Sequence, residues 1–233
     1  MAVRITTLSE NTAQLGFLGE WGLSILVETE TAKVLLDTGL STSAVYNADL
    51  MGIDFSTIDT IVLSHAHGDH TGGLRDVLRR VRKQVQVIAH PDIWIPKYVV
   101  YDEMSRYAGI PYMKEDLESL GASFTLTAKP FKIGDDITTT GEIEMTTDYE
   151  TIDGRLCVKK GDRMISDPLA DDLALIIKTS EGLVLITGCA HRGIINTVRQ
   201  VRSSQESNTY IQSSAVRTLW WLPRNALKRP LTS

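Results

Sequence analysis

The sequence predicts an α+β fold built from short strands, turns and amphipathic helices. Three observations carry this prediction. Short runs of β-branched and apolar residues recur along the chain, separated by turn residues. Residues 60–90 follow the order strand, loop, helix, strand, which is that of an α/β unit. Within 173–188, two apolar runs flank a Ser-Glu-Gly turn and predict a hairpin.

The first third of the chain supplies the clearest elements. "SILVET" (24–29) and "KVLLDTG" (33–39) flank a polar turn and predict a β-hairpin. "TIVLS" (60–64) has the β-branched, apolar composition of a buried strand. "LRDVLRRVRK" (74–83) repeats apolar residues at helical spacing, with Arg and Lys on the other side. "VQVIAH" (85–90) predicts the next strand.

The middle and later segments are less regular. Between residues 92 and 120 we expect helix, interrupted by Pro96 and Pro111. Residues 122–165 predict further strands joined by turns, and a helical period resumes over 193–202.

Composition limits the classes of function that fit. The chain has 233 residues, of which 42% are hydrophobic and 23% charged, as in an ordinary globular protein. A net charge of −5 argues against nucleic-acid binding by the chain as a whole. The two cysteines, Cys157 and Cys189, are too few for a disulfide framework and indicate a reducing compartment. Neither a membrane span nor a signal peptide is expected, so we expect a cytoplasmic protein.

A cluster of metal-binding residue types follows the predicted strand at 60–64. His65, His67, Asp69 and His70 lie within six residues, and packing does not explain this density. Imidazole nitrogen and carboxylate oxygen suit Zn²⁺, Fe or Mn²⁺. We expect Gly68 to permit the tight backbone that brings the ligands together.

The cluster and its flanks resemble a known family. H-x-H-x-D-H followed by T-G-G-L is similar to the signature of the metallo-β-lactamase fold superfamily, as are "LLDTG" (35–39) and "GLVLITGCAH" (182–191). More narrowly, "EWGLSILVET", "AHPDIW", "DPLADDLALIIKT" and "TGCAHRGI" resemble the 7,8-dihydropterin-6-methyl-4-(β-D-ribofuranosyl)aminobenzene-5′-phosphate synthase-like subfamily. The resemblance runs from about residue 3 to about residue 198.

The resemblance implies an αββα sandwich, with two mixed sheets face to face, helices outside and metals at one edge. His65, His67 and His191 would hold one metal, and Asp69 and His70 a second. Zn²⁺ is the expected metal, as one or two ions, with Fe or Mn²⁺ as alternatives. Asp69 would also act in catalysis by orienting a metal-activated water.

The implied reaction is hydrolysis or transfer at a phosphate ester, pyrophosphate, thioester or lactam-like carbonyl. The subfamily name implies instead C–N bond formation between a pterin pyrophosphate and a ribosylaminobenzene phosphate. A small molecule, phosphorylated or pterin-like, is therefore the expected partner. No membrane or nucleic-acid partner is expected, and the oligomeric state stays open.

Three further residues have two interpretations each. Cys189 occupies the position of a bridging aspartate in the wider superfamily, but it also fits as a small buried residue at a strand end. Asp37 is expected to orient the histidine loop rather than bind metal, or to form a turn before Thr-Gly. Asp172, beside Asp171, stands where relatives carry a metal-binding histidine; a solvated acidic pair is the favoured alternative.

Three other residues are candidates for substrate contact. His90 follows a strand and precedes Pro91, so it contacts substrate or metal, or else bonds the backbone. Glu20 and Trp21, at the first hairpin, are expected to line a pocket, although core packing is slightly favoured for Trp21.

The last segment departs from the family pattern. Residues 199–233 contain six Lys or Arg and one acid, and no histidine follows His191. The family's G-G-x-H-L segment and final metal-binding histidine are therefore missing. Suppose that the reading frame is shifted, so that each codon from Gln205 onward starts at its present third base. The degeneracy of the genetic code then permits a translation with a strand pattern and a G-G-x-H-L segment. We therefore hypothesise a frameshift near codons 198–204, which the coding DNA would test.

The predicted organisation is a partial metallo-β-lactamase-like domain over 1–198 and an atypical basic tail over 199–233. The second half of the sandwich would then be incomplete at the C-terminus. The leading functional prediction is a metal-dependent hydrolase or transferase. The alternative is a truncated, catalytically impaired metal-binding remnant of such an enzyme, and an RNA-binding role of the tail is weaker still.

Overall fold

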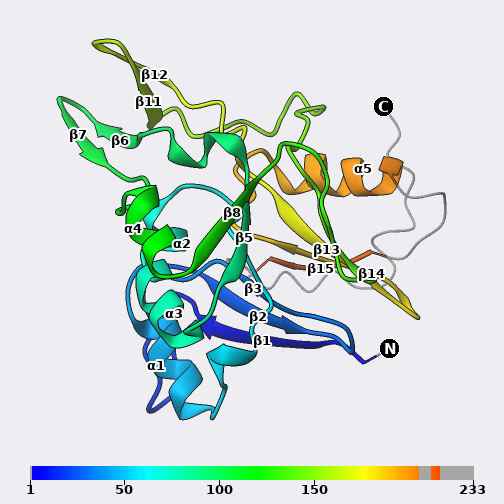
Figure 1. The fold of residues 1–233 in the computed structure, drawn as a ribbon. Helices are drawn as coiled ribbons and strands as arrows, with labels where there is room; N and C mark the ends of the chain where they lie inside the picture. The colour runs from blue at the N-terminus through cyan, green and yellow to red at the C-terminus, as the bar shows by residue number, and fades with distance from the viewer. Residues whose placement is uncertain (1, 205–210, 216–233) are drawn as a thin grey trace.

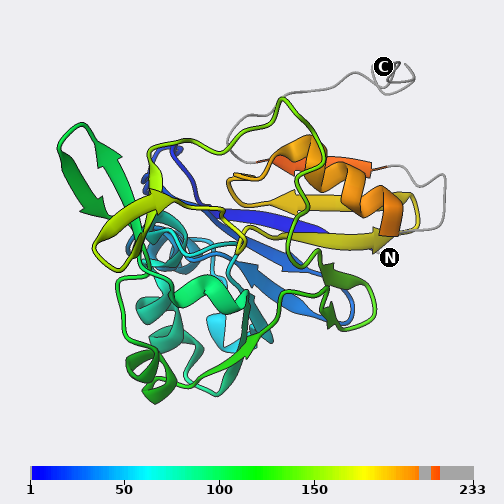
Figure 2. The same cartoon turned by 90° about the horizontal axis from the view of Figure 1, so that it is seen from above.

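Two β-sheets pack face to face at the centre of the molecule, and helices cover their outer sides (Figures 1 and 2). The computed structural model describes residues 2–204 and 211–215. Three clusters of buried apolar side chains separate the layers. One lies between the first sheet and its helices, one between the two sheets, and one between the second sheet and the last helix.

The first sheet combines an antiparallel meander with parallel strands. Its strands, in spatial order, are β1 (Arg4–Ser9), β2 (Ser24–Glu28), β3 (Lys33–Leu36), β4 (Thr60–Val62), β5 (Val85–Ala89) and β8 (Ala122–Leu126). The first three pair antiparallel, and β3, β4, β5 and β8 pair in parallel. The predicted hairpin and the predicted strand-helix-strand unit are therefore both present.

The central strands β2, β3, β4 and β5 are mostly apolar because both of their faces are buried, whereas the edge strands β1 and β8 are partly exposed. In β2, Leu26 packs among the outer helices, whereas Ile25 and Val27 face the second sheet. The helices on the outer side are α1 (Ser43–Leu50), α2 (Gly68–Thr71), α3 (Leu74–Val81) and α4 (Lys114–Ser119), with 3₁₀ turns η1 (Phe55–Thr57) and η2 (Pro91–Trp94). No helix within the described ranges is long and apolar enough to cross a membrane.

The second sheet carries the last helix on its outer face. Its strands, in spatial order, are β15 (Ile211–Ala215), β14 (Gly182–Thr187), β13 (Ala174–Thr179), β10 (Ile137–Thr139) and β9 (Lys132–Ile133). The predicted hairpin within 173–188 is β13–β14. Val201 of α5 (Ile194–Ser204) packs against Ile176 and Leu185, which closes the fourth layer.

A small third sheet projects from one end of the sandwich (Figure 1). It joins two hairpins, in the order β12 (Arg163–Ser166), β11 (Leu156–Lys160), β6 (Lys97–Tyr101) and β7 (Met104–Tyr107). The helix expected between residues 92 and 120 is wrong over this hairpin. The run Lys-Tyr-Val-Val-Tyr favours a strand, and Asp102 adopts the turn conformation with φ of 50°. In that region α-helix is confined to α4.

One strand lies where the sequence predicted an irregular basic tail. β15 pairs in parallel with β14, from Leu183 opposite Ile211 to Thr187 opposite Ala215. The rest of the predicted tail, residues 205–210 and 216–233, lies outside the described residues. The predicted domain boundary and the frameshift hypothesis therefore stay predictions.

Candidate metal centre

The histidine loop begins where β4 ends, at the carboxyl edge of the first sheet. Ser64 and His65 follow one residue after the strand, and His67 is the N-cap residue of the short helix α2. His70 lies in α2, so it returns towards the start of the loop. A second loop, after β14 of the other sheet, brings Cys189 and His191 to the same place. The centre is thus built where edges of both sheets meet.

The first cluster consists of His65, His67 and His191. One ligand atom from each lies within 4.8 Å of the others. Nε2 of His65 is 3.0 Å from Nδ1 of His67. Burial, reinforced by the neighbouring histidines, lowers the pKa of His65 well below its ordinary value. Burial likewise lowers the pKa of His67, so both rings are neutral and offer lone pairs.

This donor set fits a metal ion. Within the described part of the chain, Nε2 of His67 is buried and has no hydrogen-bond partner. A buried polar atom without a partner costs free energy unless something binds it. Three neutral imidazoles are a common ligand set for Zn²⁺. The residues present therefore suit the metal that the sequence predicts.

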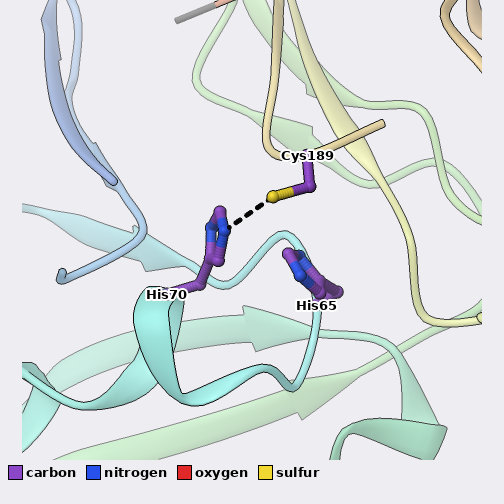
Figure 3. A group of neighbouring side chains, drawn as sticks. All are labelled: His65, His70 and Cys189. Atoms are coloured by element: carbon purple, nitrogen blue, oxygen red, sulfur yellow. Dashed lines mark hydrogen bonds between the residues drawn. The ribbon is translucent and has the colours of Figure 1, made fainter. Parts of the chain in front are cut away.

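The second cluster consists of His65, His70 and Cys189 (Figure 3). Nε2 of His70 lies 3.1 Å from the sulfur of Cys189. Burial opposes a charge on His70, but Cys189 and the Asp37 carboxylate raise its pKa well above the ordinary value. Both cysteines of the chain are free thiols, and that of Cys189 is a potential metal ligand. Both interpretations of Cys189 stay predictions.

Asp69 belongs to neither cluster. Its Oδ2 lies 3.6 Å from Nε2 of His70, and its side chain keeps 19% of its surface exposed. Asp69, His70 and Cys189 instead contribute to the lining of a small cavity. The rest of the lining comes from Glu10, Asn11, Gly22, Leu23 and Gly188. Glu10 and Asn11 were not singled out from the sequence, because neither belongs to a motif.

Asp37 holds the start of the histidine loop. Its carboxylate accepts hydrogen bonds from the Ser64 N–H and hydroxyl, each at 2.7 Å, and lies 2.6 Å from Nδ1 of His70. Asp37 is fully buried and has a φ of 58°. Ser64 also lies 2.9 Å from Nδ1 of His65. The Asp37–Ser64 pair thus contacts both His65 and His70 on the ring nitrogen away from the clusters.

Asp171 and Asp172 are buried, so the interpretation of a solvated acidic pair is wrong. Packing of the second sheet against the histidine loop covers them. Asp171 Oδ2 accepts the N–H of Ala66 at 2.9 Å, and Asp172 Oδ2 accepts the N–H of Arg192 at 2.8 Å. Burial raises the pKa of Asp172 to about 7. Neither carboxylate belongs to the two histidine clusters.

His90 forms a hydrogen bond with the backbone, as one of its two interpretations predicted. Its Nδ1 accepts the N–H of Asp92 at 3.1 Å and so caps the turn η2. Its Nε2 lies 3.8 Å from a Glu142 carboxylate oxygen. Within the described chain, His90 lies outside both metal-binding groups.

Glu20 and Trp21 differ from each other in exposure and contacts. The Glu20 carboxylate accepts the N–H groups of Leu40 and Ser41, at 2.9 and 3.0 Å. These bonds hold the loop before α1, and Glu20 is absent from the cavity lining. Trp21 is 61% exposed, so the core-packing interpretation is wrong.

Close backbone contacts, rather than an unusual conformation at Gly68, shape the loop. Gly68 begins α2 and has no positive φ. A Cβ on Gly72 would lie 2.0 Å from the Leu40 carbonyl oxygen, and one on Gly73 would lie 2.0 Å from that of Thr38. The two glycines of "TGGL" therefore let the helices approach the loop after β3.

Comparisons with known proteins show which family the chain resembles. Residues 22–197 match the family model described as the metallo-beta-lactamase superfamily. A relative from Methanocaldococcus jannaschii, named 7,8-dihydropterin-6-methyl-4-(beta-D-ribofuranosyl)-aminobenzene-5′-phosphate synthase, is 33% identical over 213 residues. That match covers 85% of this chain and 71% of the relative. An uncharacterized protein of the same organism is also 33% identical, over 87% of this chain and 75% of its own length.

A solved structure is similar in fold as well as sequence. It is Tm1679, described as a metal-dependent hydrolase of the beta-lactamase superfamily, with a TM-score of 0.76 and 28% identity. The match covers 91% of this chain and 76% of Tm1679. Together these findings confirm the family resemblance seen in the sequence.

Proposed function

The chain belongs to the metallo-beta-lactamase superfamily, and from that premise we propose that it is a metal-dependent enzyme acting on a small phosphorylated molecule. The observation that carries the proposal is the convergence of His65, His67 and His191 from two separate loops. Because these loops belong to different sheets, the cluster forms only in the folded chain. A surface group of histidines would not need that arrangement.

We assign one metal to His65, His67 and His191, with Zn²⁺ as the expected ion and Fe or Mn²⁺ as alternatives. Ser64 bonds Nδ1 of His65, which leaves Nε2 for the metal. Since one imidazole nitrogen binds one ion, a second ion would take His70 and Cys189, with Asp69 beside them. Asp37 fixes the ring of His70 by contacting its Nδ1, the nitrogen that faces away from this second group.

When bound, such a metal lowers the pKa of a coordinated water towards neutrality and polarises the phosphate oxygen. We assign Asp69 the task of orienting the attacking group. Supporting this assignment, its carboxylate lines the cavity and lies beside His70. Asp37 keeps His70 from rotating, because it occupies the other ring nitrogen.

We propose a phosphorylated, pterin-like substrate for the cavity beside Asp69 and Cys189. The cavity lies directly beside the second histidine group, because His70 and Cys189 belong to both. The name of the Methanocaldococcus jannaschii relative supports a pterin-related synthase reaction, and that of Tm1679 supports hydrolysis. Glu10 and Asn11 supply hydrogen-bonding groups at the cavity wall.

A second candidate is a metal-binding chain without turnover. The observation that favours it is the sequence after His191, which contains no further histidine. The family resemblance expects one there for the second metal.

Metal content and turnover measured on the same sample separate the two candidates. The full chain would be stripped with a chelator, reloaded with Zn²⁺, Mn²⁺ or Fe²⁺, and assayed with bis(p-nitrophenyl) phosphate and a pterin pyrophosphate. The proposal expects turnover that disappears with the metal and returns on reloading. Asp69→Asn should abolish it, whereas Asp76→Asn, on the partly exposed side of α3, should not.

Bound metal without turnover would support the second candidate. Turnover that survives complete metal removal would contradict the first, and a chain that binds no metal would contradict both.

A further inference from the structure

Lys97 is a buried cation beside the histidine loop that no motif accounts for. Its side chain is 2% exposed, and its Nζ lies 2.8 Å from Asp171 Oδ1 and 3.0 Å from Asp167 Oδ2. Burial alone would lower the pKa of Lys97, but the two carboxylates raise it above its ordinary value. A buried group of charges is weak evidence for a stabilising role, because apolar residues of similar size often serve as well. Its position suggests another purpose.

The side chain of Lys97 reaches the histidine loop through Asp171. Oδ1 of Asp171 accepts a hydrogen bond from the Lys97 ammonium group. Oδ2 of the same carboxylate accepts one from the N–H of Ala66 at 2.9 Å. Ala66 lies between His65 and His67, two members of the first cluster. The orientation of the Asp171 carboxylate therefore fixes the peptide that joins them.

The backbone of Lys97 reaches the same loop by a second route. The Lys97 carbonyl accepts the N–H of Ala108 at 2.9 Å, and the Ala108 carbonyl accepts the N–H of Gly68 at 2.8 Å. Gly68 follows His67 directly. Lys97 is thus linked to the loop on both sides of His67, once through the Asp171 carboxylate and once through the backbone of Ala108.

We propose that Lys97 is a positioning residue for the metal centre, which aligns Asp171 and thereby fixes the Ala66 peptide and the rings of His65 and His67. The inference rests on the proposed function, because it assumes that these rings hold a metal. The inference assigns a role in the metal centre to a residue of the projecting hairpin, which lies more than twenty residues after the histidine motif in the sequence. Without Lys97, Asp171 would lose the partner that holds its carboxylate in line with Ala66.

The test is Lys97→Met in the full chain, with two measurements. Amide hydrogen exchange at Ala66 and Gly68, followed by NMR in the metal-free chain, reports the loop directly. The Zn²⁺ affinity, measured by competition with a chromophoric chelator, reports how well the histidine ligands bind the metal. We expect at least tenfold faster exchange at Ala66 and a Zn²⁺ dissociation constant raised about 10- to 100-fold, the range for residues that orient ligands.

Gly68 serves as the internal control. Its bond runs through the backbone carbonyl at position 97, which Lys97→Met retains, so its exchange should change much less than that of Ala66. Lys114→Met is the external control, because Lys114 is an exposed lysine paired with Glu118 on α4. It should change neither measurement.

Lys97→Met leaves two buried carboxylates facing each other and can prevent folding. Lys97→Met/Asp167→Asn removes one of those charges, keeps the Asp171–Ala66 bond available and tests the same point. Circular dichroism shows which variant folds. A folded variant with wild-type exchange at Ala66 and wild-type Zn²⁺ affinity would overturn the inference.

A wild-type chain that binds none of Zn²⁺, Mn²⁺ and Fe²⁺ would instead overturn the proposed function. In that case exchange at Ala66 in the metal-free chain decides the positioning role by itself. Slow exchange that Lys97→Met accelerates supports it, and exchange that the substitution leaves unchanged refutes it.

Discussion

Oδ2 of Asp37 lies 2.6 Å from Nδ1 of His70, and both side chains are buried. The pair fixes which nitrogen of His70 faces Cys189 and the cavity. A carboxylate behind a histidine ligand both orients the ring and increases its basicity. Asp37 is therefore a sensitive point of the centre even though it belongs to neither metal-binding group.

Asp37→Asn should weaken metal binding at the His70–Cys189 group by about 10- to 100-fold. The amide can still accept a bond from Ser64, but it cannot supply the charge behind His70. Zn²⁺ affinity measured by chelator competition checks this. Asp76→Asn, a similar change on a partly exposed helix face, is the control, and equal affinities for the two variants would contradict the assignment.

Replacing a ligand of the first cluster should cost one bound metal ion. His67→Ala removes an imidazole whose Nδ1 lies 3.0 Å from His65, so elemental analysis should find one equivalent fewer per chain. His90→Asn is the matched control, because His90 is also buried and asparagine caps helical turns well. Equal metal loss in both variants would contradict a specific site at His67.

Gly73→Ala should destabilise the fold by more than about 2 kcal/mol, because its Cβ would overlap the carbonyl of Thr38. Gly154→Ala meets no atom within 4 Å and should change the free energy of unfolding by less than about 0.5 kcal/mol. Urea unfolding of the metal-free chains compares them. Similar stabilities would show that the loop after β3 can move away at little cost.

The pKa of Asp172, raised to about 7 by burial, predicts a pH dependence of stability. Between pH 4 and pH 7 the folded chain retains a proton on this carboxyl that the unfolded chain has lost. The stabilisation is therefore complete below the unfolded pKa and disappears as the pH rises through 7. Asp172→Asn keeps an acceptor for the Arg192 N–H but does not titrate.

Between pH 5 and pH 8 the metal-free wild type should lose about 2 to 3 kcal/mol relative to Asp172→Asn. Urea unfolding at each pH, in the presence of a chelator, measures the difference. Parallel pH profiles for the two proteins would show that Asp172 ionises normally in the folded chain.

Local patterns in the sequence predicted the part of the centre that is itself local. His65, His67 and His70 follow one buried strand, and the apolar period after them predicts α3. The position of His191 came only from the family resemblance, because its contact with His65 depends on how two sheets pack.

Features that depend on distant pairing were missed. The hairpin β6–β7 is stabilised by β11, where Leu156 lies opposite Val99, and no pattern near residue 97 reveals that partner. Lys97, which is buried against Asp167 and Asp171, was consequently not singled out from the sequence. The burial of Asp172 and the exposure of Trp21 likewise follow from packing between layers.

We propose above all that His65, His67 and His191 hold a metal ion. Anomalous X-ray diffraction at the zinc edge, from crystals of the chain reloaded with Zn²⁺, locates such an ion. We expect a strong peak enclosed by these three imidazoles. The absence of a peak, or a peak only at other residues, would contradict it.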